Sequence, residues 1–300
     1  MTHTPAISII VRTYNRPRRL RECLHSLSQQ TWRDFETLVV NDAGDDVESL
    51  LSQELGTLPF RYLRNPENRG RTACLNIGVE AARGEYIGFL DDDDVVYPVH
   101  LQTLMEAARP QRRPVVYTDV LNVTYQPGPR TGEWIREKEQ LVYSFDFDAD
   151  NFLLANYIPI HCLAIRRDCF DRVGPFDESL TILEDWEFLI RLSRSFPFLH
   201  IPKITGEYRR RDDNSNIRES EAYPVNEQII KRRYRNERDA LFDKIFKRTF
   251  QQQREIRQQT FQAQMLMQQI HHLQGQLAQA RSEAARPRNA PGAQQGEPSA

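Results

Sequence analysis

Short apolar runs alternate with amphipathic segments along the first hundred residues of the chain. The apolar runs have the length of strands and contain almost no polar residues, which is typical of strands buried on both faces of a sheet. They cover residues 6–11, 35–40, 60–63 and 86–90. The segments between them have the apolar spacing of helices, at residues 18–30, 47–55 and 72–82. This alternation predicts a parallel sheet with right-handed crossovers, an α/β fold of the Rossmann-like class.

Three of the predicted strands lead directly into polar loops. Residues 12–15 (RTYN) follow the first strand, residues 41–46 (NDAGDD) follow the second, and residues 91–94 (DDDD) follow the fourth. The carboxyl ends of parallel strands meet at one edge of a sheet, and open α/β folds bind their ligands there. We therefore expect a single binding crevice lined by these loops.

The run of four carboxylates, Asp91 to Asp94, indicates the chemistry of this crevice. Adjacent carboxylates repel one another and raise each other's pKa unless a cation lies between them. A hard divalent metal ion, with a phosphate completing its coordination, would supply that cation. The alternative is a solvated acidic turn, but the position of the run directly after a strand favours metal and phosphate binding.

Beyond residue 98 the pattern is less regular. We predict helices over 98–108 and 183–195, a short helix and a turn within 166–180, and strands over 115–125, 160–166 and 200–208. Residues 126–134 (QPGPRTGEW) have the composition of a turn, and residues 209–216 that of a polar loop.

From about residue 223 the chain has a long helical pattern, strongly amphipathic and basic over residues 231–250. Further along, apolar residues follow the alternating three- and four-residue steps of a heptad, at Leu266, Ile270, Leu273, Leu277, Ala280 and Ala284. Gln252 and Gln259 interrupt the same register upstream. The pattern is that of a weak coiled coil that forms a homodimer, or of a lone helix. The predicted domains are an α/β domain at 1–220, a helical extension at 221–284 and a disordered tail at 285–300.

The charge is distributed unevenly. Residues 1–200 hold 22 Lys and Arg against 30 Asp and Glu, whereas residues 201–300 hold 18 against 12. The basic C-terminal third suggests contact with an anionic ligand or an anionic membrane surface, or a basic solvated helix. Nucleic-acid binding is disfavoured, because the body is acidic and carries no motif that recognises DNA or RNA.

The four cysteines, Cys23, Cys74, Cys162 and Cys169, have neither disulfide nor metal-site spacing, which indicates a reducing compartment. No apolar stretch has the length of a membrane span, and the first residues lack a signal-peptide pattern. We expect a protein that is cytoplasmic or peripheral on the inner face of a membrane.

Three motifs in order along the chain resemble the inverting family 2 glycosyltransferases, which have the GT-A fold. They are ISIIVRTYNRPRRLRECLHSLSQQTWRDFETLVVNDAGDD, ENRGRTACLNIGVEAARGEYIGFLDDDD with its DxD motif, and LEDWEFLIRL, similar to the family's acidic "ED" motif. The resemblance covers about residues 6–215. It implies a GT-A sheet with a C-terminal helical extension, and transfer of a sugar from a nucleotide-diphosphate sugar.

The resemblance also assigns the donor site. It makes Asp91 and Asp93 the DxD pair, with Asp93 the more direct ligand of Mn²⁺ or Mg²⁺, and it makes Asp42 the carboxylate that recognises the nucleotide base. Asp92 and Asp94 would add sugar contacts or support the metal ligands. The residues it implies for nucleotide-sugar binding are Thr13, Tyr14, Arg16, Asp42, Arg71, Asp91, Asp92, Arg209 and Arg211.

Inversion at the anomeric carbon requires a general base that takes the proton of the acceptor hydroxyl. Asp185 has the position that resembles the family base, and Glu184 is the competitor; either acid could instead only cap its helix. Arg209 and Arg211 would clamp the diphosphate or an acidic acceptor. The family often has a histidine shortly after the Tyr208-Arg209 element, and this chain does not. We interpret His161, an isolated histidine, as structural.

The predicted function is therefore metal-dependent, inverting transfer from a UDP, GDP or dTDP sugar to a saccharide or glycolipid acceptor, in surface polysaccharide or lipopolysaccharide synthesis. The alternatives are a nucleotidyltransferase and a non-catalytic scaffold that binds nucleotide sugars. The first would normally have a Gly-rich loop after the first strand, and residues 12–17 contain no glycine. The second would have lost the acids, and the expected acids are present.

Overall fold

The computed structural model describes residues 3–130, 133–211 and 220–284 of the 300-residue chain. The chain divides into two compact units, the first ending at Arg238 and the second beginning at Asp239. The tail predicted at 285–300 and much of the loop predicted at 209–216 lie outside the described residues.

The first half of the first unit is the predicted strand–helix alternation. Its elements are β1 (Ile7–Thr13), α1 (Pro17–Ser28), β2 (Phe35–Asn41), α2 (Glu48–Leu55), β3 (Phe60–Arg64), α3 (Arg71–Ala81) and β4 (Tyr86–Asp91). The strands pair in parallel in the order β3-β2-β1-β4. Every residue of β1 and β2 is buried, as the continuous apolar runs predict.

The second half completes a mixed sheet. Its elements are β5 (Val95–Val96), α4 (His100–Ala108), β6 (Val115–Pro127), β7 (Trp134–Tyr143), α5 (Ala149–Leu154), the 3₁₀ helix η1 (Ile160–Cys162), β8 (Leu163–Arg166), α6 (Asp168–Val173), α7 (Glu184–Ser193) and β9 (Phe198–Arg211). The sheet continues from β4 as β8-β6-β9-β5, with β7 paired to β6. Only β6 and β9 pair in parallel here, so the expectation of a parallel sheet holds for the first half alone.

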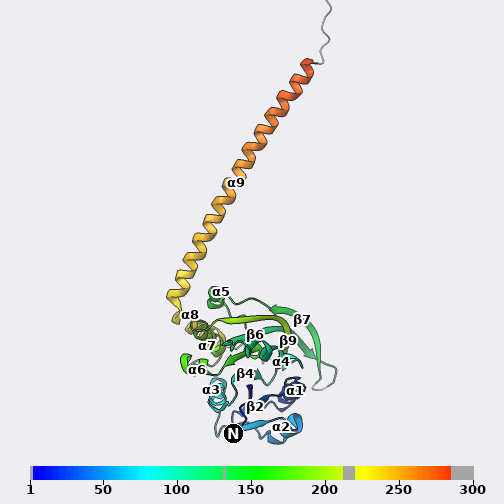
Figure 1. Ribbon diagram of the computed structural model, residues 1–300, viewed down its shortest axis with the longest axis vertical. Helices are drawn as coiled ribbons and strands as arrows, with labels where there is room; N and C mark the ends of the chain where they lie inside the picture. Colours follow the sequence, from blue (N-terminus) through cyan, green and yellow to red (C-terminus); the bar gives the residue numbers. More distant parts are fainter. Residues whose placement is uncertain (1–2, 131–132, 212–219, 285–300) are drawn as a thin grey trace, which may run out of the picture. The chain divides into compact units, whose positions relative to one another are not determined.

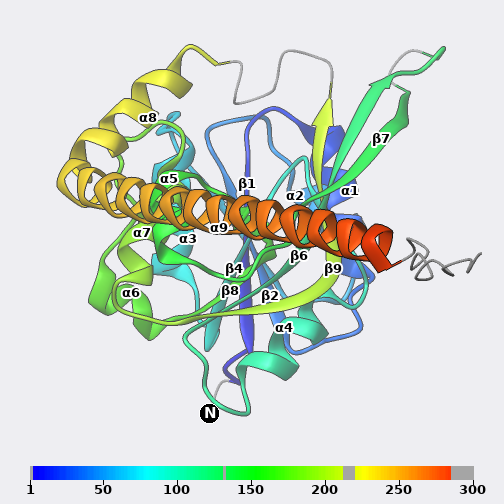
Figure 2. The same cartoon turned by 90° about the horizontal axis from the view of Figure 1, so that it is seen from above.

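Helices cover both faces of the sheet. Alternate residues of each strand point to opposite faces, and the core is correspondingly divided into two clusters. One cluster joins the sheet to α3, α5, α6 and α7, and the other joins it to α1, α2 and α4 (Figures 1 and 2). The result is a three-layer α/β/α arrangement.

The C-terminal part begins with α8 (Ala222–Arg233), and the chain turns at Tyr234 before α9 (Arg235–Ala284). The expected long helix is thus two helices. Ile230 and Tyr234 are buried in one of the core clusters, so α8 packs with the first unit. The domain boundary that we place after residue 220 stays a prediction. Among the described residues, no helix has a stretch long and apolar enough to span a lipid bilayer.

Candidate active site

The loops that follow β1, β2 and β4 meet at the carboxyl edge of the sheet around a cavity of about 430 Å³. The predicted site residues that line it are Thr13, Tyr14, Arg16, Asp42, Arg71, Asp91, Asp92, Asp93, Asp185, Arg209 and Arg211. Glu184 is the exception, because it is buried and does not line the cavity. The structure thus brings together residues that are up to about two hundred positions apart in the sequence.

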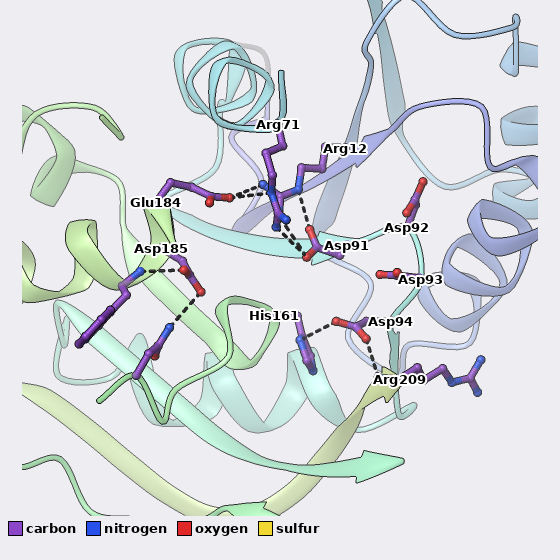
Figure 3. Close-up of polar contacts among 12 residues, drawn as sticks. Arg12, Arg71, Asp91, Asp92, Asp93, Asp94, His161, Glu184, Asp185 and Arg209 are labelled. Carbon is purple, nitrogen blue, oxygen red and sulfur yellow. Dashed lines mark hydrogen bonds and ion pairs between the residues drawn. The ribbon is translucent and has the colours of Figure 1, made fainter. Parts of the chain in front are cut away.

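Two acids of this region are held by two guanidinium groups (Figure 3). Arg12 lies opposite Asp91 in the pairing of β1 with β4, and its Nε and Nη2 donate to the two carboxylate oxygens at 2.7 and 3.1 Å. Its Nη1 donates to Glu184 Oε1 at 2.6 Å. Arg71, in the first turn of α3, donates to the same oxygen at 3.1 Å and lies 3.7 Å from Asp91. Two acids and two arginines therefore form a charge-balanced cluster that ties α7 to β1, β4 and α3.

This cluster keeps its acids ionised. Burial by itself would raise the pKa of Asp91, but Arg12 and then Arg71 lower it to about 2. Burial also opposes ionisation of Glu184, and the same two arginines lower its pKa. Glu184 Oε2 is buried and has no hydrogen-bond partner in the described part of the chain. Both acids are occupied as ion-pair partners at neutral pH.

Asp185 is the neighbour of Glu184 and, among the described residues, forms no hydrogen bond or ion pair with an arginine. Leu183 precedes the pair in the left-handed region, with φ of 61°, a strained conformation for leucine that directs the chain into α7. Asp185 Oδ1 accepts the N–H of Trp186 at 2.8 Å, and Oδ2 accepts Asn156 Nδ2 at 3.2 Å. Burial, and then the charge of Glu184, raise the pKa of Asp185 to about 6.

Trp186, whose backbone N–H donates to this carboxylate, is a core residue. It is buried, and its Nε1 donates to the carbonyl oxygen of Phe152 at 2.8 Å.

The acids that follow β4 are less fully compensated. Asp92 is buried and accepts a hydrogen bond from Thr13 Oγ1 at 2.7 Å. Asp93 has looser ion pairs, with Arg19 at 3.3 Å and with Arg16 at 3.5 Å. Burial and the charges of the neighbouring carboxylates, Asp94 first, raise the pKa of Asp93 to about 7. Arg16 and Arg19 therefore compensate the negative charge at Asp93 only in part.

The geometry of these acids suits a divalent cation. Asp91, Asp93 and Asp94 each present one carboxylate oxygen, and the three oxygens lie within 4.8 Å of one another. Oxygen ligands of this kind suit Mg²⁺ and Mn²⁺. The geometry of the three oxygens is one observation that fits a cation at this position, and the incomplete neutralisation of the Asp93 carboxylate is another.

Asp94 is positioned by two groups that the sequence does not link to it. Its Oδ1 accepts the backbone N–H of Arg209 at 2.8 Å, and His161 Nδ1 lies 3.1 Å from its Oδ2. His161 is buried, lines the cavity, and lies parallel to Tyr208 with ring centroids 6.4 Å apart. Its Nε2 is buried without a hydrogen-bond partner among the described residues. Our structural interpretation of His161 is thus incomplete, because this histidine orients an acid of the site.

Sequence reasoning also missed Arg12 as a member of the site. The sequence contains only a partial signal: Arg12 follows directly on the apolar run of residues 6–11, and a charge at the end of a buried strand needs a partner, but the sequence does not identify that partner. No comparable local signal identifies His161, whose partner is 67 residues away along the chain.

Asp42, directly after β2, is fixed to the loop that precedes α3. Its Oδ1 accepts the N–H of Arg69 and Asn65 Nδ2, both at 2.8 Å, and its Oδ2 accepts the N–H of Gly70 at 2.9 Å. Gly70 has φ of 86°, in the region that favours glycine. Burial would raise the pKa of Asp42, but these donors, Arg69 first, lower it. Asp42 also lines the cavity. Recognition of a nucleotide base by its carboxylate stays a prediction.

Arg209 and Arg211 also line the cavity, and both already form hydrogen bonds within the protein. Arg209 donates to Glu207 at 2.8 Å and to Glu22 at 2.7 Å. Arg211 donates to Glu22 at 3.2 Å and to the backbone oxygen of Asp93 at 3.3 Å, and its Nε is buried without a partner in the described structure. Contact of either guanidinium with a diphosphate stays a prediction.

The chain is similar in sequence to known glycosyltransferases. The family model described as "Glycosyl transferase family 2" matches residues 8–174. The uncharacterized glycosyltransferase YwdF of Bacillus subtilis is 30% identical over 210 residues, which are 70% of this chain and 76% of that protein. An uncharacterized glycosyltransferase of Haemophilus influenzae is 29% identical, over 62% of this chain and 61% of its own. Chondroitin synthase of Escherichia coli is 26% identical over 73% of this chain, but only 31% of that protein is covered.

TarS and PcManGT are among the solved structures that resemble this one. S. aureus TarS 1–349 in complex with UDP-GlcNAc gives a TM-score of 0.56 at 19% identity, over 69% of this chain and 59% of that one. The mannosyltransferase PcManGT of Pyrobaculum calidifontis, in complex with GDP-Man and Mn²⁺, gives 0.53 at 19% identity, over 69% and 57%. At this level of identity the likeness concerns the fold.

Proposed function

The chain belongs to glycosyl transferase family 2 and has the predicted GT-A fold, and from this premise we propose that it is a metal-dependent inverting glycosyltransferase. It would move a sugar from a nucleotide-diphosphate sugar to a hydroxyl group of a saccharide or glycolipid, in surface polysaccharide or lipopolysaccharide synthesis. Family membership argues against the nucleotidyltransferase alternative. The non-catalytic scaffold is the alternative that the experiment below tests.

One observation carries the proposal: a single cavity holds an incompletely neutralised cluster of acids and, apart from it, the carboxylate of Asp185, which in the described part of the chain is not ion-paired to an arginine. The first is suited to a cation with a diphosphate, and the second to accepting a proton. Inverting transfer needs both, at opposite sides of the reacting carbon.

On the donor side, Asp93 and Asp94, with Asp91, would hold Mn²⁺ or Mg²⁺. When bound, the ion supplies positive charge to the diphosphate leaving group. Arg71 and Arg16 line the same cavity and would add positive charge beside the phosphates. TarS and PcManGT were solved with UDP-GlcNAc and GDP-Man, respectively, which favours a UDP or GDP sugar over a dTDP sugar as donor.

On the acceptor side, Asp185 would be the general base. With a pKa of about 6 it is ionised at neutral pH and still able to take a proton. Asn156 holds Oδ2 and the backbone of Trp186 holds Oδ1, so the carboxylate is oriented before any acceptor arrives. Glu184 is less suited to this role, because it is buried and bound to two arginines.

The experiment is a donor screen that separates binding from turnover. The purified chain is incubated with UDP, GDP and dTDP sugars, with Mn²⁺ or with EDTA, and release of the nucleoside diphosphate is measured together with thermal stabilisation. We expect one nucleotide class to stabilise the protein and to be released, both only with metal, and the Asp185→Asn variant to keep the stabilisation and lose the release. Metal-dependent binding with no release from any donor, with saccharide acceptors present, would favour the scaffold.

A further inference from the structure

The second compact unit carries an exposed apolar surface near the start of α9. Ile245, Phe246, Phe250 and Ile256 are 42%, 70%, 56% and 60% exposed, and we call these four residues the apolar face. The rings of Phe246 and Phe250 stack with centroids 6.3 Å apart. At about 100° per residue, the four side chains share an arc of about 140° on the helix. Large apolar side chains gathered on one helix face in this way mark an interaction surface.

The opposite side of the same helix is basic. Lys247, Arg248 and Arg254 are exposed, and their spacing places them on the arc across from the apolar face. Residues 243–257 contain five Lys and Arg against two Asp and Glu; of the five, only Arg257 falls within the arc of the apolar face. An apolar face that carries phenylalanine, with lysine and arginine on the other side, is typical of a helix that lies in the interface of a bilayer.

We propose that residues 243–257 of α9 bind the surface of a membrane that contains anionic phospholipids. The apolar face would enter the boundary between head groups and acyl chains, where such helices are buried to a depth of about 5–10 Å. Lys247, Arg248 and Arg254 would stay at the level of the phosphates, and each basic residue near an anionic surface strengthens binding. The positive charge of this segment is complementary to that surface.

A second copy of this chain is the other occupant to consider, and the pattern fits it less well. A coiled-coil seam is a narrow stripe with alternating three- and four-residue steps. The apolar face is wider, and Gln252 and Gln259 interrupt the heptad around it. The regular heptad begins further along α9, with Leu266, Ile270 and Leu273. The membrane and the second copy would therefore use different residues.

The test is vesicle co-sedimentation of the full-length protein, with phosphatidylcholine alone and with added phosphatidylglycerol. We expect binding to the anionic vesicles, and at least tenfold weaker binding for the Phe246→Ser/Phe250→Ser variant, because two large apolar side chains no longer leave water. The Lys247→Gln/Arg248→Gln variant should bind several-fold more weakly at low salt, with a smaller difference at high salt. The matched control, Leu266→Ser/Leu273→Ser, should bind as the unaltered protein does.

The altered residues are exposed, so each variant should keep the melting temperature of the unaltered protein. Three results would overturn the proposal: no vesicle binding, equal binding to neutral and anionic vesicles, or undiminished binding by the Phe246→Ser/Phe250→Ser variant. A dimer in sedimentation equilibrium that this variant converts to a monomer, without vesicle binding, would assign the apolar face to a second copy. The assay contains no nucleotide or metal, so its outcome is independent of the proposed transfer reaction.

Discussion

The active-site region contains two kinds of acid that are adjacent in the sequence and differ in their surroundings. Asp91 and Glu184, the paired acids, are bound by Arg12 and Arg71, and their pKa values lie below the ordinary range. Asp93 and Asp185, the weakly paired acids, have pKa values raised to about 7 and about 6.

The difference shows that some acids of this site stabilise the fold, whereas others are available to bind a cation or a proton. A carboxylate that is paired with a guanidinium group fixes the elements on either side and has less affinity left for a cation or a proton, so Asp91 would only supplement Asp93 and Asp94 at a metal ion. A carboxylate that is short of positive charge has that affinity. Asp91 lies two residues before Asp93, and Glu184 lies directly before Asp185. In each of these two pairs the first acid is a paired acid and the second is weakly paired, so position in the sequence does not reveal which kind an acid belongs to.

The largest effect should come from a weakly paired acid. The Asp185→Asn substitution removes the proposed base and should lower kcat by roughly 10²–10⁴-fold, the usual contribution of general acid–base catalysis. Release of nucleoside diphosphate in the presence of acceptor measures it. The Asp171→Asn substitution, at an exposed acid of α6, is the control and should leave kcat unchanged. An Asp185→Asn variant with undiminished turnover would remove Asp185 from the mechanism.

The next effect concerns the paired acids and is one of stability. The Arg12→Met substitution leaves Asp91 and Glu184 with one arginine between them, and should lower the free energy of unfolding by about 3–5 kcal/mol, as when a buried ion pair loses one partner. Urea denaturation at neutral pH measures it.

The control for this change is Arg16→Met. The side chain of Arg16 is 44% exposed and lies 3.5 Å or more from its acids, so its loss should cost less than about 1 kcal/mol. Equal effects of the two substitutions would mean that the cluster around Arg12 is no more important to the fold than a surface ion pair.

A smaller effect is a shift in pH dependence. Because Asp185 must be ionised to accept a proton, kcat/KM should rise as the pH rises through about 6. The Glu184→Gln substitution removes a negative charge that raises this pKa, and it leaves Arg12 and Arg71 less neutralised. Both changes favour ionised Asp185, so the rising limb should move to lower pH. A pH–rate profile in which the limb stays in place or moves upward would contradict the coupling of the two acids.

The regular part of the fold was predictable because its signals are local. From β1 to β4, apolar runs buried on both faces alternate with amphipathic helices, and the elements are those that the sequence predicts. The strand β7 was missed because most of its residues are exposed and, within the described ranges, it pairs with β6 alone, so it lacks a buried face that would show as alternation. Residues 160–162 form a 3₁₀ turn instead of the start of the predicted strand. The antiparallel pairings depend on contacts between distant segments.

The acids of the site could be named from the sequence, because they follow strands or begin a helix in motifs that resemble a known family. The residues that bind these acids could not be named from the sequence. Arg12 is recognised only when β1 is paired with β4, and His161 only when the turn at residues 160–162 is packed beside Asp94. The division between paired and weakly paired acids is therefore a property of the fold.

The central claim is that Asp93, the weakly paired acid that follows β4, binds a divalent cation together with Asp94 and Asp91 and, through it, a nucleoside diphosphate. The most direct measurement is thermal unfolding of the full-length protein with and without Mn²⁺, in the presence of UDP or GDP, for the unaltered chain, Asp93→Asn, and Asp46→Asn as an exposed control. A ligand that binds only the folded state raises the melting temperature. We predict that Mn²⁺ and one diphosphate together raise it in the unaltered chain and in Asp46→Asn but not in Asp93→Asn. The same rise in Asp93→Asn, or no rise in the unaltered chain with either diphosphate, would contradict the account.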